Sequence, residues 1–493
     1  MAEPQPVADE LQLTRWLFLR LLGAVYVIAF ASLAVQVAGL MGPRGLTPAA
    51  AYLDQAHSIY GAGAYRLLPT LFWLGAGDAA LQVVAWTGAA LGLLVVLGIA
   101  PRAALAGAWL LYLSLSVAGQ DFLSFQWDAL LLETGLLAVL WAPSGWRPRR
   151  ELPPPSAAVR WLLVFLLFKL MFLSGATKLL SGDPTWRDLT ALDYHFETQP
   201  LPTWLGWYAH QLPSWVHRVQ TAVMFAIELG APWLLFAPAR LRRLRYAGVA
   251  ALVLLQTGIA LTGNYGFFNL LAVVLCVPAL DDGVVRRALP LRIATAERGA
   301  PWRRAVLLAL VPPIALVSGL SAWAELAYTS AAGGRGAALP GWGATLLGWV
   351  APLRSFNGYG LFRVMTTERP ELVVEGSLDG DRWLAYDLSY QPGPVTRAPG
   401  FVAPYHPRLD WQLWFAALDP MSGAPLLQAL SRALRAGSPA VVALAGRDPF
   451  PKVEPRYVRF ALYDYRFTTW SERRRTGAWW ARELRGYLPD TSP

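Results

Sequence analysis

Apolar segments of membrane-spanning length recur along the chain. A helix of about 17 to 25 mainly apolar residues crosses the hydrocarbon core of a bilayer, which is about 30 Å thick. Such windows predict nine spans, at residues 16–40, 80–99, 103–117, 127–142, 161–179, 219–236, 247–261, 267–280 and 305–324. The seventh and eighth are short, so they are either two helices or one re-entrant hairpin around residues 262–266.

Arginines between these segments predict the orientation of the chain. Loops rich in Lys and Arg stay on the cytoplasmic side of a membrane. The arginines follow the second, fourth, sixth and eighth spans, at Arg102; Arg147, Arg149 and Arg150; Arg240, Arg242, Arg243 and Arg245; and Arg286, Arg287, Arg292, Arg298, Arg303 and Arg304. A cytoplasmic N-terminus puts all four groups on one side. It also puts loops 41–79 and 181–218, and the chain after about residue 325, outside.

The last third of the chain has a strand-like pattern. Residues 370–377 and 383–389 are expected to be strands joined by a turn at Asp379-Gly380, where Gly380 would need a positive φ. Residues 457–467 alternate as a half-buried strand, and residues 408–418 and 469–488 predict helices. We therefore expect a membrane all-α bundle (residues 1–325) and a C-terminal, β-rich α+β domain outside the membrane (residues 326–493).

Composition and charge exclude several classes of protein. The chain is 55% hydrophobic and 15% charged, which excludes a soluble protein. Its net charge of +10 comes from short arginine runs between apolar segments, a pattern that favours membrane topology over nucleic-acid binding. A single cysteine, Cys276, allows no internal disulfide. No phosphate-binding loop, dinucleotide fingerprint or nucleophile elbow is present, and internal repeats typical of many transporters are not evident.

Histidines and acidic residues give no metal or hydrolytic site. All five histidines (His57, His195, His210, His217 and His406) fall in the predicted outer parts, as expected if histidine is simply disfavoured in lipid. Pro213 breaks the helix that would align His210 with His217, so we expect no metal ion. Asp193 and Glu197 flank His195 without a third member of a triad.

Three charged residues lie at a similar depth inside predicted spans four, five and six. Glu133, Lys169 and Glu228 stand eight or nine residues from the cytoplasmic ends, which at about 1.5 Å per residue is a depth of about 12–14 Å. An unpaired charge is costly there. We predict that Lys169 pairs with Glu228, with Glu133 as alternate or second partner. Alternatively, the carboxyl groups are protonated and donate to helix carbonyls.

Lys178 is the second lysine of the fifth span, in a chain with only three lysines and 39 arginines. Nine residues at about 100° each put Lys169 and Lys178 on opposite helix faces, so we expect them to serve different sites. Lys178 lies near the predicted outer interface. Its side chain either extends to the head groups or acts as a base or carboxylate anchor.

A set of motifs resembles the lipase maturation factor family. They are Gly119-Gln-Asp-Phe-Leu-Ser-Phe-Gln-Trp-Asp128 with Glu133; Ser174-Gly-Ala-Thr-Lys178 through Trp186; Ala191-Leu-Asp-Tyr-His195-Phe-Glu197-Thr-Gln199-Pro-Leu-Pro202; Leu261-Thr-Gly-Asn264-Tyr-Gly-Phe-Phe-Asn269; Asn357-Gly-Tyr359-Gly360 with Met365-Thr-Thr-Glu368-Arg369; and Arg408-Leu-Asp410-Trp-Gln-Leu-Trp-Phe-Ala-Ala417. The resemblance runs from about residue 40 to 488, in both halves of the chain.

This resemblance implies a multi-pass membrane protein that helps secreted proteins fold and assemble without being an enzyme. Animal members act on lipases from the endoplasmic reticulum membrane. The arginine bias of this chain is typical of GC-rich bacterial genes, which would place it in a cytoplasmic membrane. The expected partners are membrane lipid and a secreted client, possibly a lipase. The expected functional residues are Lys178, Trp186, His195, Glu197, Gln199, Asn264, Asn357, Tyr359, Glu368, Arg369, Arg408 and Asp410. Asn357-Gly358-Tyr359-Gly360 is either a turn that starts the outer domain or a ligand loop.

A shorter resemblance suggests an alternative function. Thr177-Lys178-Leu179 followed by Trp186 is similar to an element of vitamin K-dependent γ-glutamyl carboxylases, in which a lysine acts as the base in quinone chemistry. Under this alternative the chain is a membrane enzyme that uses Lys178 as its base, with a quinone as cofactor, on an exported protein or lipid. The maturation-factor interpretation requires no cofactor.

Overall fold

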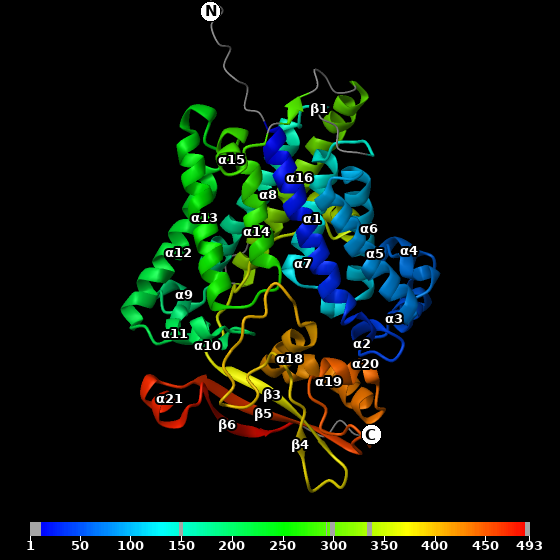
Figure 1. Ribbon diagram of the computed structural model, residues 1–493, viewed down its shortest axis with the longest axis vertical. Coiled ribbons are helices and arrows are strands. Elements are labelled where there is room, and N and C mark those ends of the chain that lie inside the picture. Colours follow the sequence, from blue (N-terminus) through cyan, green and yellow to red (C-terminus); the bar gives the residue numbers. More distant parts are fainter. Residues whose placement is uncertain (1–10, 147–150, 292, 296–300, 333–337, 489–493) are drawn as a thin grey trace, which may run out of the picture.

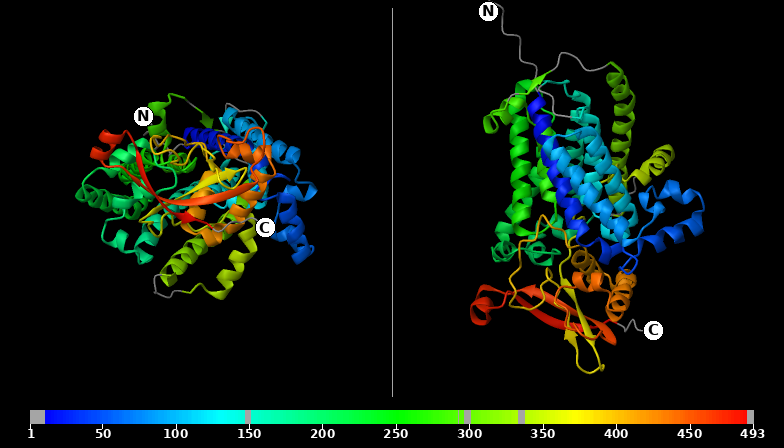
Figure 2. Two further views of the ribbon diagram at one scale, coloured as in Figure 1. Left: turned by 90° about the horizontal axis from the view of Figure 1, so that it is seen from below. Right: turned by 45° about the vertical axis from the view of Figure 1, so that its right-hand side comes forward.

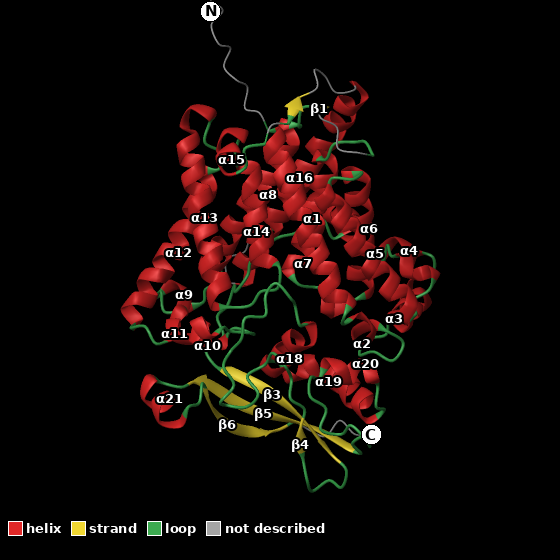
Figure 3. Ribbon diagram, viewed as in Figure 1, coloured by secondary structure: helices red, strands yellow, loops and turns green. Residues whose placement is uncertain are grey.

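A helical bundle and a β-sheet domain are stacked along the long axis of the molecule. The structure is a computed structural model, and it describes residues 11–146, 151–291, 293–295, 301–332 and 338–488. A four-stranded sheet lies at one end of the bundle (Figures 1 and 3). The start of α1 and the short helix α15 (Asp282–Ala288) lie at the opposite end (Figure 1). Seen from below, α16 and α17 stand at the periphery of the bundle (Figure 2).

Six helices in the described part of the chain are long and apolar enough to cross a membrane. They are α1 (Gln12–Ala34), α5 (Asp78–Leu97), α6 (Pro101–Ala118), α8 (Ala157–Leu180), α13 (Arg242–Thr262) and α16 (Pro301–Ala332). Each coincides with one of the nine predicted spans.

The other three predicted spans are also helical, but they do not meet the same criteria of length and hydropathy. They are α7 (Gln126–Trp141), α12 (Ser214–Leu234) and α14 (Phe268–Cys276), which continues as a 3-10 turn, η4 (Val277–Ala279). The 16 residues of α7 extend only about 24 Å, and α12 begins with polar residues. The expectation of nine full spans is therefore reduced to six candidates among the described residues. Helices α13 and α14 are separate, with residues 263–267 between them.

Small residues allow the two N-terminal spans to pack closely. A Cβ atom on Gly23 of α1 would lie 2.9 Å from the carbonyl oxygen of Gly92 on α5, and one on Gly92 would lie 2.9 Å from the backbone nitrogen of Val27. Helices in a membrane gain van der Waals contact when small residues let their backbones approach. The contact therefore depends on glycine at both positions.

The described parts of the predicted basic loops lie at the end of the bundle that is remote from the sheet (Figure 1). Arg102 is the second residue of α6, Arg242 begins α13, and Arg286 lies in α15. At this end the carboxylate of Asp282 accepts hydrogen bonds from the backbone N–H groups of Leu13 and Thr14, at 2.9 and 2.7 Å. Residues 151–152 and 294–295 pair there as two short parallel strands, β1 (Glu151–Leu152) and β2 (Ala294–Thr295). Arg147, Arg149, Arg150, Arg292 and Arg298 lie outside the described residues.

Short helices cover the end of the bundle that faces the sheet. They are α2 (Val37–Met41), α3 (Ala49–Tyr60), α4 (Gly63–Leu67), η1 (Leu71–Leu74), η2 (Gln120–Leu123), α9 (Pro184–Arg187), α10 (Leu192–Thr198) and α11 (Trp204–His210). The end of α8, with α9 and α10 after it, lies here. Asp183 caps α9 by accepting from the Thr185 N–H at 2.7 Å, and it also accepts from the Met365 N–H at 2.6 Å.

The C-terminal domain contains an antiparallel sheet with strand order β4-β3-β5-β6. The strands are β3 (Arg369–Ser377), β4 (Leu384–Ala385), β5 (Tyr457–Phe467) and β6 (Trp480–Tyr487). Helices α18 (Arg408–Leu418), α19 (Pro420–Arg435) and α20 (Pro439–Leu444) lie between this sheet and the bundle (Figure 3). The remaining elements are η3 (Ala239–Leu241), α17 (Gly341–Val350), η5 (Ala351–Leu353) and α21 (Trp470–Thr476).

The predicted helix at residues 469–488 is wrong in its second half. Helix α21 begins with a capping box between Thr469 and Glu472, as its sequence favours. It ends at Gly477, which has a φ of +70°, and the chain then returns as β6 beside β5. Trp480 becomes buried there with its ring 4.4 Å from that of Phe467. Tertiary pairing therefore outweighs the helix propensity of Ala-Arg-Glu-Leu-Arg.

The predicted hairpin forms between β3 and β4, but β4 covers only residues 384–385 of the predicted strand 383–389. Its turn can be tested. Gly380 has a φ of +89°, and a Cβ added there would meet only Tyr457, at 3.8 Å. Gly380→Ala should therefore lower the free energy of unfolding by about 1 kcal/mol, because the strain lies in the backbone and not in a collision. Thermal unfolding of the purified protein would measure this cost.

Gly400→Ala is the matched control, because its φ is not positive and nothing lies within 4 Å of its added Cβ. Equal melting temperatures for the two variants would contradict the turn assignment.

Candidate functional site

A cavity of about 540 Å³ lies among α8, α10, α12 and α13. Its wall is mostly apolar, and its polar groups come from helices α8, α10, α12 and α13 and from the segment after α13. The lining residues are Met171, Ser174, Lys178, Trp186, Leu192, His195, Phe196, Ala209, Val219, Gln220, Val223, Met224, Ile227, Glu228, Leu254, Leu255, Gln256, Gly258, Ile259, Thr262, Tyr265, Phe268, Leu361 and Phe362. Small-molecule sites in proteins usually have volumes of about 300–1,000 Å³.

Lys178 and Glu228 form a buried ion pair in the wall of this cavity. The Lys178 ammonium lies 2.9 and 2.8 Å from the two carboxylate oxygens of Glu228. The ring of Trp186 lies 5.3 Å from the same nitrogen, and its indole N–H donates to the Phe362 carbonyl at 3.0 Å. Lys178 therefore does not extend to the head groups, and its amine is held as a hydrogen-bond donor by a carboxylate.

His195 lines the cavity and has a buried ring nitrogen without a hydrogen-bond partner among the described residues. The Gln199 amide nitrogen donates to the carbonyls of Phe196 and Thr262, at 3.1 and 2.9 Å, so its oxygen must be the acceptor for the Tyr265 hydroxyl at 2.7 Å. Tyr265 has then used its proton, and the His195 Nε2, 3.3 Å from its oxygen, must carry a hydrogen. The buried Nδ1 of His195 has no hydrogen-bond partner among the described residues. Burial, and secondly the nearby Lys178 charge, lower the pKa of His195 to about 4, so the ring is neutral at pH 7.

Lys169 pairs with Glu133, so the predicted pairing with Glu228 is wrong and the alternate partner is correct. Its ammonium lies 2.6 Å from Glu133 Oε1 and also donates to Ser318 and Ser321, at 3.1 and 3.3 Å. Glu133 Oε2 accepts from the Tyr359 hydroxyl at 2.7 Å and from the Asn357 N–H at 3.3 Å. The network joins α7, α8, α16 and the segment that leads to the C-terminal domain.

The depth of a charge within its span could not reveal this partner. Lys169 and Lys178 leave α8 on opposite faces, as predicted, so only Lys178 faces α12 and Glu228. Ser318 and Ser321, three residues apart in the apolar middle of α16, are the sequence signal for a polar neighbour of Lys169.

Arg408 connects the C-terminal domain to the bundle through a buried charge. It donates to both carboxylate oxygens of Asp128, at 2.8 and 2.9 Å, and to the Phe122 carbonyl. The Tyr112 hydroxyl also donates to Asp128. Only 1% of each side chain of the Arg408–Asp128 pair is exposed to solvent. Asp128 ends the motif at residues 119–128, but the sequence did not predict its role.

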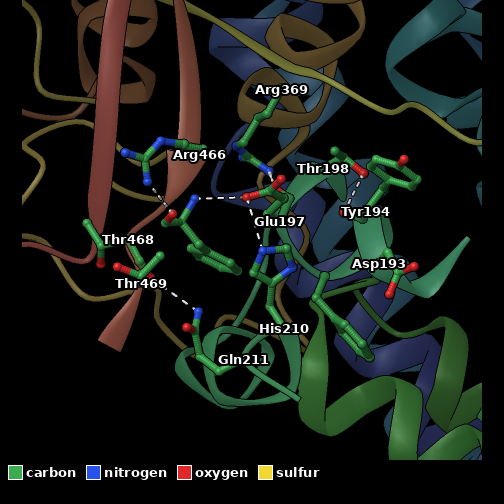
Figure 4. Close-up of polar contacts among 12 residues, drawn as sticks. Asp193, Tyr194, Glu197, Thr198, His210, Gln211, Arg369, Arg466, Thr468 and Thr469 are labelled. Atoms are coloured by element: carbon green, nitrogen blue, oxygen red, sulfur yellow. Dashed lines mark hydrogen bonds and ion pairs between the residues drawn. The ribbon is translucent and has the colours of Figure 1, made fainter. Parts of the chain in front are cut away.

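Arg369 and Glu197 make a second connection between the two parts (Figure 4). Arg369 donates to the carbonyls of Glu197, Gln199 and Pro200 and pairs with Glu371 at 2.5 Å. The Glu197 carboxylate accepts from the Phe467 N–H at 2.9 Å and lies 3.5 Å from His210 Nε2. These groups fix α10 against β3 and β5.

Other predicted residues divide between structural contacts and the surface. Asn264 donates to the carbonyls of Leu201 and Gly400, at 3.1 and 2.8 Å, and it accepts from two backbone N–H groups after Gly400. Glu368 is exposed and pairs with Arg485 at 2.5 Å. Asn357 and Tyr359 belong to the Glu133 network and lie in the extended segment that leads to β3. None of these four lines the cavity.

No metal site is evident within the described ranges, because no three His, Cys, Asp or Glu side chains come together. His217 pairs instead with Asp193, at 2.7 Å. The cavity therefore unites Lys178, Trp186 and His195 from the predicted set with Glu228, Gln256 and Tyr265, whose part in it was not predicted.

These features define a multi-pass membrane protein with a sheet-bearing domain fixed to one end of its helical bundle. Residues 13–287 match the lipase maturation factor transmembrane domain, and residues 355–489 match the lipase maturation factor C-terminal domain. The chain belongs to the lipase maturation factor family, which confirms the resemblance of its motifs.

Named relatives align with nearly the whole chain. Lipase maturation factor 2 of Homo sapiens is 36% identical over 98% of this chain and 83% of its own length. Lipase maturation factor 2 of Gallus gallus is 36% identical, over 97% and 81%. Lipase maturation factor 1 of Bos taurus is 33% identical, over 97% and 89%. No solved structure matches the chain.

The two ion pairs of α8 predict which carboxylate substitution restores stability after each lysine is replaced. Lys169→Met leaves Glu133 buried without its cation, which should cost about 3–5 kcal/mol. Adding Glu133→Gln should recover much of this loss, and adding Glu228→Gln should not. Lys178→Met should show the reverse preference. Melting temperatures of the four single and four double variants in one detergent would measure the pattern, and rescue by the mismatched partners would contradict these pairings.

Asp410 predicts a pH dependence of stability. Its side chain is buried in α18, its Oδ1 has no hydrogen-bond partner among the described residues, and burial raises its pKa to about 7. An unfolded Asp has a pKa of about 3.9. The folded state therefore keeps the Asp410 proton up to a higher pH than the unfolded state does. The free energy of unfolding falls as the pH rises from about 4 to about 7, by up to about 1.4 kcal/mol per pH unit.

Asp410→Asn should remove this loss. The melting temperature of the variant should exceed that of the natural protein by more at pH 7.5 than at pH 5. A constant difference between the two pH values would show that Asp410 does not titrate in this window.

Proposed function

We propose that this chain is a membrane-bound maturation factor that holds a secreted client protein, a lipase, while the client folds and assembles. The client class comes from the names of the relatives, which are lipase maturation factors. The observation that carries the proposal is a partly exposed surface of arginines stacked on aromatic rings in the C-terminal domain.

The orientation we propose puts this domain outside. In this orientation the chain crosses the membrane nine times, by the six candidate spans and the shorter helices α7, α12 and α14. An odd number of crossings puts the N-terminus and the C-terminal domain on opposite sides of the membrane. The arginine-rich end at α15 then faces the cytoplasm, in agreement with the positive-inside rule. In a bacterium the protein would lie in the cytoplasmic membrane, and in eukaryotic members of the family in the endoplasmic reticulum membrane. Secreted clients are present on the outer side in both cases.

The arginine–aromatic face consists of Trp383, Arg459, Tyr463, Arg482 and Tyr487. The Arg459 guanidinium lies 4.0 Å from the ring centres of both Trp383 and Tyr487, and the Arg482 guanidinium lies 4.6 Å from that of Tyr463. Tyr487 remains 50% exposed. Tyr, Trp and Arg are enriched at protein–protein interfaces and dominate their binding energy. This face therefore has the composition of a binding surface and not of an inert one.

A groove of about 660 Å³ lies beside this face. Its wall includes Val373, Leu384 and Arg482, and Leu384 is 50% exposed on the edge strand β4. An edge strand offers unpaired backbone groups to an extended segment of another chain. The groove and the face together would hold an incompletely folded segment of the client through backbone and aromatic contacts.

The alternative, a carboxylase-like enzyme that uses Lys178 as its base and a quinone as cofactor, has weaker support. A base needs a free lone pair, whereas both carboxylate oxygens of Glu228 engage the Lys178 amine. The family names of the relatives also describe maturation and not catalysis.

Arg459→Ala together with Arg482→Ala tests the proposed surface. In cells that co-express a secreted lipase, this change should lower the yield of active lipase roughly tenfold, as expected for the loss of two central contacts. Arg474→Ala is the control, because Arg474 is exposed in the same domain but lies outside the face. Active lipase in the medium and the amount of folded maturation factor in the membrane would both be measured.

An unchanged lipase yield with the double variant would contradict the proposed face. Lys178→Met with Glu228→Gln serves as a second arm, because it removes the amine without leaving a buried charge. The lipase yield should survive this change if the protein is a maturation factor. Loss of yield at normal expression would favour the enzyme.

A further inference from the structure

We propose that the cavity among α8, α10, α12 and α13 binds an uncharged lipid with a hydroxyl head group, of the monoacylglycerol class, which enters from the bilayer between α12 and α13. This inference goes beyond the proposed function, because it concerns a lipid ligand and not the client. It can also be tested without any client.

Helices α12 and α13 touch at one end and separate at the other. A Cβ on Gly248 of α13 would lie 2.9 Å from the Ala231 carbonyl oxygen and 3.0 Å from the Leu234 Cβ, so the two backbones are close there. Ten residues further along α13, about 15 Å, Gly258 lines the cavity and has nothing within 4 Å of an added Cβ. The helices therefore leave an opening beside Gly258.

The edges of this opening are apolar and exposed. Val219 and Val223 of α12 are 54% and 51% exposed, Leu254 of α13 is 70% exposed, and all three line the cavity. Apolar side chains exposed on membrane helices face acyl chains, since bilayer hydrocarbon is their solvent. The cavity is therefore continuous with the lipid phase, and a chain of methylene groups can occupy it without leaving an apolar environment.

The polar groups of the cavity select an uncharged head group. Among the lining residues Lys178 is the one cation, and Glu228 neutralises it at 2.8 Å. A phosphate or a fatty-acid carboxylate would bring a charge without a free partner, at a high desolvation cost. An uncharged head group avoids this cost.

The hydrogen-bonding groups that remain require both a donor and an acceptor in the ligand. His195 Nδ1 is an unoccupied acceptor, as derived above. The Gln256 oxygen accepts from Asn269 at 2.8 Å, and among the described residues its amide nitrogen has only the Met171 sulfur, at 3.5 Å, as an acceptor. A hydroxyl can donate to His195 while an ester carbonyl accepts from Gln256. An oxidised quinone has acceptors only and would leave His195 unsatisfied.

Photolabelling of the purified full-length protein in detergent tests this site. The probe is a monoacylglycerol with a diazirine in its acyl chain, and the competitors are 1-monooleoylglycerol, oleate, dioleoyl phosphatidylglycerol and a long-chain quinone. We expect labelled peptides from α12 or α13, and competition by 1-monooleoylglycerol at a concentration at least tenfold below that needed for each of the others.

Two variants with controls locate the ligand. Gly258→Phe fills the opening and should reduce labelling at least tenfold. Gly230→Phe is the matched control, since Gly230 is also a helical glycine with nothing within 4 Å, but it lies outside the cavity lining. His195→Phe keeps a ring beside Phe362 but removes the acceptor, and it should weaken binding about fivefold to tenfold.

Three outcomes would overturn the proposal. They are equal labelling of the Gly258→Phe and natural proteins, equal or stronger competition by oleate or phosphatidylglycerol, and equal or stronger competition by the quinone. The last outcome would transfer the site to the quinone alternative. Melting temperatures of all variants would show that the labelled proteins are folded.

Discussion

The buried pair of Arg408 and Asp128 is the interaction on which the arrangement of the two parts depends. Desolvating two charges is costly, and the cost is offset only when their hydrogen bonds are satisfied. Here Asp128 receives two bonds from Arg408 and one from Tyr112, so α6, α7 and α18 meet at one carboxylate. Because α18 and α19 lie between the bundle and the sheet, this contact sets where the sheet stands.

The two lysines of α8 form similar ion pairs that have different roles. Lys169 and Glu133 have further partners in Ser318, Ser321, Tyr359 and Asn357, so the charged groups of both residues have all their hydrogen bonds inside the protein. Lys178 and Glu228 pair with each other in the wall of the cavity, which His195 also lines. The buried Nδ1 of His195 has no hydrogen-bond partner among the described residues. The first pair holds helices together. The second gives a membrane cavity a polar end without a net charge.

The sequence predicts elements well where local pattern decides them. All nine apolar segments are helical, and the bounds predicted for residues 408–418 and 457–467 coincide with α18 and β5. Motif residues also identified three side chains of the cavity, Lys178, Trp186 and His195. The errors arise where the partner is distant in sequence. Residues 480–487 become a strand only because β5 is beside them, and Lys169 meets Glu133 because of the face it occupies on α8, which depth alone does not specify.

A distance measurement between the two parts tests the central claim most directly, namely that buried charge fixes the C-terminal domain to the bundle. Spin labels on Leu74→Cys and Met421→Cys suit this purpose, because the native side chains are 92% and 85% exposed and the single native cysteine is buried. Pulsed electron spin resonance should give a narrow distance distribution in the natural background and a broad one after Asp128→Asn, which leaves Arg408 without its anion. A distribution that is already broad, or one that stays narrow after Asp128→Asn, would contradict the account.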